Sequence, residues 1–192
     1  MKNSKFWIWF IPLFVILCIG IYINLSRNSQ NNNNNITDSV KIKEEYIKDN
    51  DKYYNVELSD TNVYKYIDTN TLNDIFNNKD GLLFIGDKTS NMARKDITVL
   101  NDVVSSTSIL QVYYVDVNDL NDDLKNIINE KTDNVEISGG TLIAVQGGKV
   151  LNIFNPKYTI NSTELSDSEK LLLYNDYKDI INNFVEECNE NC

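Results

Sequence analysis

Residues 82–95 read LLFIGDKTSNMARK, and this stretch decides the fold. The run LLFI at 82–85 is continuously apolar, as in a strand that is buried on both faces. The polar residues at 86–89 form a turn signal, and a helix should begin at Thr89 or Ser90. Its inner side would carry apolar residues that recur at helical spacing, namely Ile97, Leu100, Val103 and Val104. A buried strand that leads directly into an amphipathic helix is typical of an α/β domain.

Further strands and helices are expected on both sides of this stretch. The Gly147-Gly148 pair predicts a hairpin turn, and the last helix has an apolar face made by Leu173, Tyr177, Ile180, Ile181, Phe184 and Cys188. The resulting order, β-α-β-α-β-α-β-β-α, predicts a central mixed sheet with helices on each side. Its early strands are parallel and its late hairpin is antiparallel. The expected elements are strands at 63–67, 82–85, 110–115, 141–145 and 150–154, and helices at 72–76, 90–104, 120–128 and 166–187.

Two segments resemble a known family. Residues 84–95, FIGDKTSNMARK, resemble the F-x-G-x-x-x-C-x-x-C-R-K segment of thioredoxin-like bacteriocin transport accessory proteins. Residues 135–150, VEISGGTLIAVQGGKV, resemble the later V-P-T-L-x-x-x-x-x-G-K-V segment of that family. The resemblance implies a thioredoxin-like fold over residues 56–187. It also implies that the start of the helix near residue 90 corresponds to a redox loop.

The departures from the family pattern remove the redox chemistry. Ser90 stands where the resemblance places the attacking cysteine, and Ala93 stands at the resolving cysteine. Gly140 replaces the cis-proline, and Phe84 occupies a position where many thioredoxins carry a buried acid. Disulfide exchange needs a thiolate, and a serine hydroxyl has no comparable acidity. We therefore expect a degenerate redox site and no enzyme activity.

The same loop could still bind a ligand without thiols. Thioredoxin-like proteins receive extended peptides on this face, so the resemblance implies a peptide-binding face at Ser90, Asn91, Met92, Ala93, Gly140 and Thr141. We interpret Ser90 itself as a helix N-cap. A serine nucleophile activated by Lys88 or Lys95 is the less favoured reading.

Composition excludes several classes of site. The chain has 192 residues and no histidine, so it can hold neither a Ser-His-Asp triad nor a zinc site with imidazole ligands. Its net charge is −10, although the first 27 residues contain only basic charges. An acidic body argues against a nucleic-acid partner, because phosphate contacts need clustered Lys and Arg. We expect no cofactor and no metal.

Residues 1–27 are expected to be a signal anchor that forms one transmembrane helix. The 20 residues at 6–25 carry no charge, and a helix of that length spans about 30 Å. We favour this over a cleaved signal peptide, and over a lipoprotein lipidated at Cys18, because Leu17 fills the small-residue position of a lipobox. Lys2 and Lys5 precede the span, which favours a cytoplasmic N-terminus and an extracytoplasmic domain in the cell membrane.

A flexible tether is expected at 28–52 and the thioredoxin-like domain at 53–192. The tether contains five consecutive Asn residues at 31–35, a composition that cannot bury apolar surface. The charged stretch at 42–54 is expected to be a short exposed helix or further linker. The compact domain should therefore start near Tyr53.

The last two cysteines are the remaining candidates for redox chemistry. Cys188 and Cys192 lie four residues apart, so on a helix their Cα atoms would be about 6 Å apart, within reach of a disulfide if the last turn frays. We favour a structural or incidental role for this pair over redox activity or pairing between molecules.

Three functions fit these observations. The leading hypothesis is a membrane-anchored, redox-inactive accessory module that binds an exported peptide or a membrane-protein partner. A bacteriocin or other secretion system is one setting that the resemblance implies. The second is a thiol-disulfide protein that uses Cys188 and Cys192. The third is a structural subunit of an envelope assembly.

Overall fold

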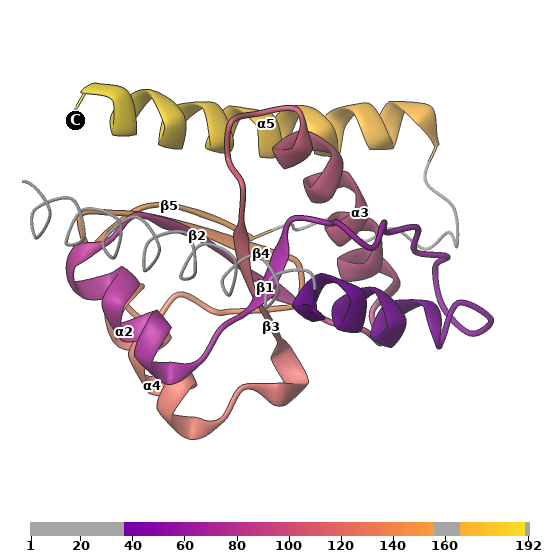
Figure 1. Ribbon diagram of the computed structural model, residues 1–192, viewed down its shortest axis with the longest axis horizontal. Coiled ribbons are helices and arrows are strands. Elements are labelled where there is room, and N and C mark those ends of the chain that lie inside the picture. Colours follow the sequence, from indigo (N-terminus) through magenta and orange to yellow (C-terminus); the bar gives the residue numbers. More distant parts are fainter. Residues whose placement is uncertain (1–36, 156–165, 191–192) are drawn as a thin grey trace, which may run out of the picture. The chain divides into compact units, whose positions relative to one another are not determined.

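The computed structural model describes residues 37–155 and 166–190, without the side chains of 187–190 (Figure 1). The predicted membrane segment, the Asn tract, Cys192 and the Cys188 side chain lie outside these residues. Among the described residues, no helix is long and apolar enough to cross a membrane. The elements are β1 (Tyr64–Tyr66), α2 (Thr69–Asn78), β2 (Gly81–Gly86), α3 (Asn91–Ser105), β3 (Val112–Asp116), a 3-10 turn (Val117–Asp119), α4 (Asp122–Lys131), β4 (Thr141–Gln146), β5 (Lys149–Phe154) and α5 (Asp167–Glu190).

These elements form a mixed α/β fold around one five-stranded sheet. The strand order is β1-β3-β2-β4-β5. β3 pairs in parallel with β1 and β2, whereas β4 pairs antiparallel with β2 and β5. The predicted alternation of elements, the burial of the LLFI strand on both faces and the late hairpin are thus confirmed. One boundary differs, because Leu110 lies before β3 with 91% of its surface exposed.

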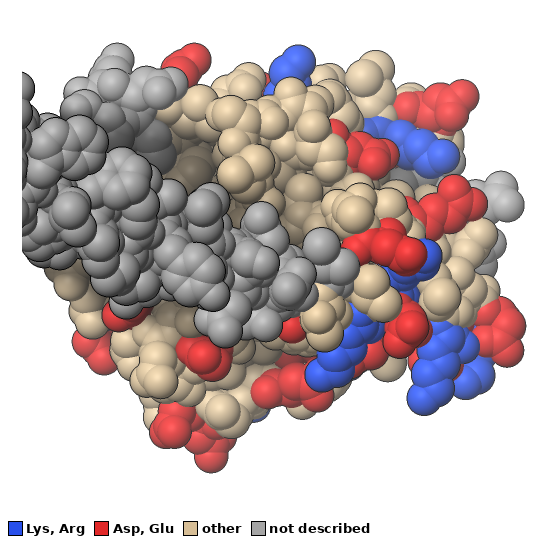
Figure 2. Space-filling model, in the orientation of Figure 1, with Lys and Arg blue, Asp and Glu red and all other residues tan. Residues whose placement is uncertain are grey.

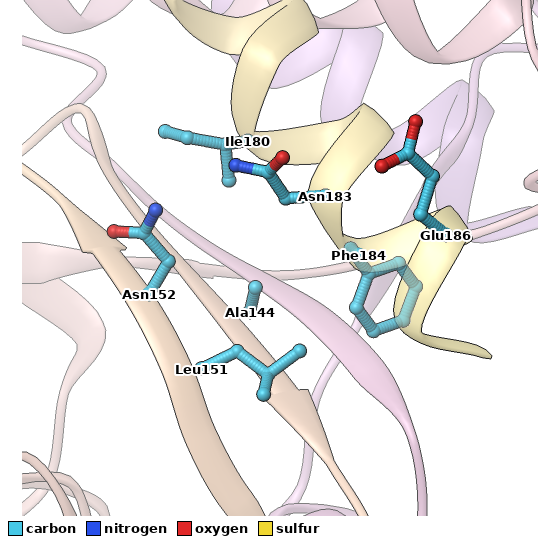
Figure 3. Close-up of a pocket in the computed structure, with 7 residues that line it drawn as sticks. All are labelled: Ala144, Leu151, Asn152, Ile180, Asn183, Phe184 and Glu186. Carbon is cyan, nitrogen blue, oxygen red and sulfur yellow. The ribbon is translucent and has the colours of Figure 1, made fainter. Parts of the chain in front are cut away.

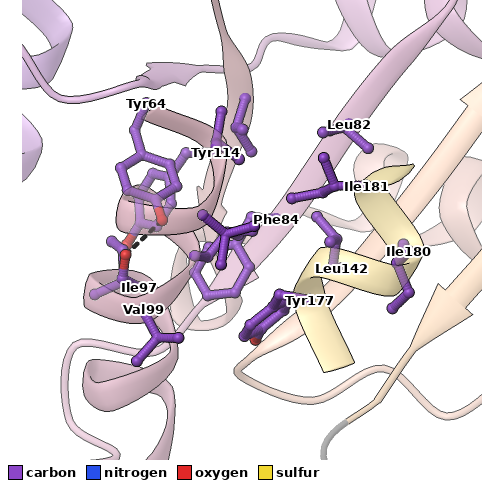
Figure 4. Packing of buried hydrophobic residues seen from close by; sticks show 14 of the residues in the cluster. Tyr64, Leu82, Phe84, Ile97, Val99, Tyr114, Leu142, Tyr177, Ile180 and Ile181 are labelled. Atoms are coloured by element: carbon purple, nitrogen blue, oxygen red, sulfur yellow. Dashed lines mark hydrogen bonds between the residues drawn. The ribbon is translucent and has the colours of Figure 1, made fainter. Parts of the chain in front are cut away.

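Helices cover both faces of the sheet, and each face has its own core. On one face α2 and α4 pack over Leu83, Ile85 and Ile143. On the other, α3 and α5 pack over Phe84 and Leu142 (Figure 4). The central strand alternates between these two cores, which is why it reads as a continuous apolar run. Burying one side chain of this size contributes about 1.5–3 kcal/mol.

A helix at residues 37–47 belongs to the compact unit, which begins at Asp38. Ile42 and Tyr46 on this helix are fully buried against the α3 side of the sheet. The structure therefore differs from the expected start at Tyr53 and from an exposed helix or linker at 42–54. The physical reason is the spacing of Ser39, Ile42 and Tyr46, which places all three buried side chains on one face of the helix.

Candidate functional site

The turn between β2 and α3 is held by two carboxylates. Asp87 Oδ1 accepts hydrogen bonds from the backbone N–H of Thr89 at 2.8 Å and from its hydroxyl at 2.7 Å. Asp116, fully buried at the end of β3, accepts from the backbone N–H of Lys88 at 2.9 Å. Parallel strands end at the same edge of a sheet, which is why Asp87 and Asp116 meet here. Such a network fixes the backbone of the loop before the helix begins.

The first turn of α3 contains four of the predicted site residues. Ser90 is the N-cap, as predicted, and its hydroxyl accepts from the backbone N–H of Ala93 at 3.4 Å. Asn91 Oδ1 accepts from the backbone N–H of Tyr54 at 2.6 Å. Ala93 is fully buried, whereas Met92 is partly exposed. Ser90 and Asn91 are also partly exposed but are engaged in these hydrogen bonds, so Met92 is the apolar side chain that this turn offers to a ligand.

A glycine turn before β4 lies against this helix start. A Cβ atom at Gly139 would be 2.4 Å from Asp87 Cβ and 3.2 Å from Ala93 Cβ, so the two segments are in van der Waals contact. Gly140 adopts φ 96°, a value that L side chains rarely adopt. Its N–H donates to Ile85 O at 2.7 Å.

Two further hydrogen bonds fix the glycine turn. The buried Tyr177 hydroxyl on α5 donates to Gly140 O at 3.2 Å. Thr141 is fully buried, and its hydroxyl donates to Ser138 O at 2.8 Å. The structure thus brings Ser90, Asn91, Met92 and Ala93 together with Gly140 and Thr141 at one end of β2.

Lys88 is engaged in an ion-pair cluster beside this loop. Its Nζ lies 3.0 Å from Glu45, 3.1 Å from Asp119 and 3.9 Å from Asp116. Burial alone would lower the pKa of Lys88, but the hydrogen bonds to Glu45 and Asp119 raise it overall. A lysine held in its charged form is a poor base for Ser90. Figure 2 shows acidic and basic side chains interspersed over this part of the molecule, near the helix at 37–47.

Arg94 has a structural role that sequence reasoning missed. It is fully buried and donates four hydrogen bonds: Nε to Tyr54 O at 2.7 Å, Nη1 to Lys88 O at 2.9 Å, and Nη2 to Tyr46 O at 2.8 Å and Asn50 Oδ1 at 2.6 Å. The guanidinium therefore joins the first turn of α3 to residues 46–54. The F-x-G-x-x-x-C-x-x-C-R-K resemblance marks this position but does not reveal these partners.

Asp96 is a buried acid that the sequence also did not reveal. It is 1% exposed, and neither carboxyl oxygen has a hydrogen-bond partner in the part of the chain that the structure describes. Burial raises the pKa of Asp96 well above its usual range, and the neighbouring Lys95 offsets this only in part. A buried carboxyl in this environment is stable in its neutral form.

A depression of about 300 Å³ lies between β5 and α5 (Figure 3). Val150 pairs with Val145 and Asn152 pairs with Ala144, so Leu151 is the extra residue of a β-bulge. The bulge leaves Leu151 at the depression, where 40% of its surface is exposed. A bulge on an edge strand opposes pairing with a further strand, which is a structural reason for Leu151 to lie here.

No cluster of three or more metal-ligating side chains occurs among residues 37–155 and 166–186. No protein-family model matches the sequence, and no curated protein is significantly similar to it. The functional reading therefore rests on the residues of the chain and on their geometry.

Proposed function

We propose that this chain is a membrane-anchored, extracytoplasmic and redox-inactive module of the thioredoxin-like type, which binds an exported peptide or a membrane-protein partner. The order of elements supports the fold assignment, because alternating parallel units followed by an antiparallel hairpin are what the resemblance predicts. The proposed role is that of an accessory protein and not of an enzyme.

The observation that carries the proposal is the contact of Ala93, in the first turn of α3, with the glycine turn at Gly139. The Ser90 hydroxyl caps α3, and Ala93 offers no reactive group. Lys88 is held in its charged form by carboxylates, and this position has no thiolate. What remains is a rigid surface with a partly exposed Met92, and such a surface can bind but cannot exchange disulfides.

The proposed location rests on the apolar segment at 6–25 and the Asn-rich residues that follow it. The acidic body favours a protein partner over nucleic acid, whose phosphates would be repelled.

Two measurements on the full chain test this function, the first in detergent and the second in living cells. The first is insulin-disulfide reduction by the wild type beside its Cys188→Ser/Cys192→Ser variant, with no turnover expected from either. Turnover that is lost in the variant would instead assign the function to the C-terminal cysteines.

The second measurement is photo-crosslinking in living cells from a photoreactive residue placed at Met92. The matched control carries the same residue at the exposed Glu130 of α4, on the other side of the sheet. We expect a discrete adduct from position 92 and none from position 130. Equal adducts from both positions would contradict a binding face at Met92.

A further inference from the structure

A second surface on the described part of the chain has the form of a binding groove. It has a volume of about 540 Å³ and lies between the segment after the first helix, the middle of α3 and the start of α5. Its lining includes the rings of Tyr53 and Tyr54, two carboxylates at Glu57 and Asp102, and Lys170. The α3 residues of the groove begin at Thr98, about 9 Å along the helix from Met92. None of the residues assigned to the first face lines this groove.

The tyrosine wall of this groove is fixed in place. The backbone of Tyr54 is held at both ends, since its N–H donates to Asn91 Oδ1 at 2.6 Å and its carbonyl accepts from Arg94 Nε at 2.7 Å. Asn50 closes the loop, because Val56 N–H donates to its Oδ1 at 3.0 Å and its Nδ2 donates to Val56 O at 3.2 Å. A wall that is ordered before binding costs little conformational entropy when a ligand arrives.

The rings of this wall are also positioned by cations of the same chain. The Arg94 guanidinium carbon lies 5.7 Å from the centroid of the Tyr53 ring, and Lys95 Nζ lies 5.4 Å from that of Tyr54. Both contacts are within the range of cation–π attraction. The loop from residue 50 to residue 56 therefore belongs to the α3 scaffold, although it contains no regular strand.

The described lining of the groove carries two acids and one base, while the buried Arg94 and Lys95 lie against its tyrosine rings. Glu57 and Asp102 are exposed, and neither forms an ion pair with any residue that the structure describes. Lys170 is the only basic residue among the described lining residues. Because the whole chain carries −10, this groove attracts a positively charged ligand and repels a second copy of the chain.

We propose that this groove binds a Lys- or Arg-containing segment of a partner polypeptide. The methylene groups of a basic side chain would pack on Tyr53 and Tyr54, while its charged end would lie between Glu57 and Asp102. Tyrosine walls with nearby carboxylates suit such a side chain, because its stem is apolar and its end is cationic. This inference goes beyond the proposed function, since it concerns a different surface and names the chemistry of the partner.

The test is fluorescence anisotropy with the full chain in a neutral detergent. The probe is a labelled peptide of alternating Gly and Lys, beside the same peptide with Glu in place of Lys. We expect the Lys peptide to bind more weakly as salt is added, and the Glu peptide not to bind. The Glu57→Gln/Asp102→Asn variant should bind the Lys peptide about tenfold more weakly at low salt.

Matched controls separate the groove from the general acidity of the chain. The Glu130→Gln/Glu136→Gln variant has the same net charge and changes exposed acids elsewhere, so its affinity should match that of the wild type. Tyr54→Leu should weaken binding with no change of charge. The four substituted acids are all exposed, and a thermal unfolding curve for each variant confirms that it folds.

Other results would overturn the inference. These are no binding of the Lys peptide, equal binding of the Glu peptide, or an equal loss of affinity in the control variant. A Met92→Asp variant separates the two surfaces, because it changes the first face alone and should bind the Lys peptide as tightly as the wild type. If Met92→Asp abolishes peptide binding and Glu57→Gln/Asp102→Asn does not, the groove is excluded while the proposed function stands.

Discussion

The Nη2 group of Arg94 donates a hydrogen bond to the carbonyl oxygen of Tyr46 at 2.8 Å, which joins residues 48 positions apart in the sequence. Tyr46 lies near the end of the helix at 37–47, and its ring is 5.5 Å from the guanidinium carbon. A buried guanidinium is stable only when its donors are satisfied. Arg94 donates to backbone and amide oxygens, and no carboxylate pairs with it among the residues that the structure describes.

Arg94→Met should therefore destabilise the protein strongly. The substitution leaves the carbonyl oxygens of Tyr46, Tyr54 and Lys88 without this donor, and we expect a loss of about 3 kcal/mol or more in the free energy of unfolding. Urea unfolding measures this loss, and hydrogen exchange should show faster exchange over residues 46–56. Lys125→Met, at an exposed site on α4, should change the free energy by less than about 0.5 kcal/mol. Similar losses in the two variants would contradict the role given to Arg94.

Asp96 makes stability depend on pH. Its pKa is raised in the folded state, so the folded protein binds more protons than the unfolded chain once the pH exceeds the usual carboxyl pKa of about 4. The contribution of Asp96 to stability is therefore most favourable below that pH, and it falls as pH rises toward the raised folded-state pKa.

Asp96→Asn should remove this part of the pH dependence and stabilise the protein at pH 7 by about 1–3 kcal/mol. Thermal unfolding across the acidic and neutral range checks both effects. The control is Asp102→Asn, an exposed acid on the same helix, which should leave the wild-type slope in place. A slope that survives in Asp96→Asn would assign the pH dependence to other groups.

Gly139 has no room for a side chain. An alanine there would bring its Cβ within 2.4 Å of Asp87 Cβ, so either the glycine turn or the loop before α3 must shift. We expect Gly139→Ala to cost about 1–3 kcal/mol, as overpacking does. Gly147→Asn is a suitable control, because nothing lies within 4 Å of a Cβ there and Asn tolerates its φ of 53°. Equal unfolding midpoints for the two variants would contradict the close contact.

Ser90→Cys combined with Ala93→Cys should restore weak disulfide exchange, if the proposed correspondence with the redox loop holds. The first thiol would lie at the N-terminus of α3, where the helix dipole favours a thiolate. Insulin reduction measures the activity, with Ser90→Cys alone as the control that lacks a second thiol in this loop. The same low rate in both variants would argue against that correspondence.

Sequence reasoning predicted most of the fold because the signals are local. The run at 82–85 has two buried faces, the Gly147-Gly148 pair makes a hairpin, and the apolar face of α5 repeats at helical spacing. Ser90 was predicted as an N-cap for the same reason, since its acceptor role depends on residues only three positions away.

The features that the sequence did not reveal depend on distant partners. The helix at 37–47 is rich in charged residues, and only three of its side chains, all on one face, are buried. In the sequence, Arg94 has a residue type that is usually exposed. Its partners, such as the carbonyl oxygens of Tyr46 and Lys88, lie close to it only in the folded chain. Aspartate is rarely buried without a partner, and Asp96 is buried in this way. The pattern of residue types therefore could not predict its burial.

The way in which Arg94 and Lys88 tie the first helix to the sheet has a mechanical consequence. A tensile load applied at residue 37 reaches the helix at 37–47 before any strand of the sheet. The guanidinium hydrogen bonds and the Lys88–Glu45 ion pair hold the end of this helix to the loop before α3 and to the first turn of α3. Ser39, closer to the load, is also tied by hydrogen bonds to Asp60 O at 2.6 Å and from Asn62 Nδ2 at 2.8 Å. A pull on the amino-terminal side would therefore have to break the attachments of this helix before it separates the strands.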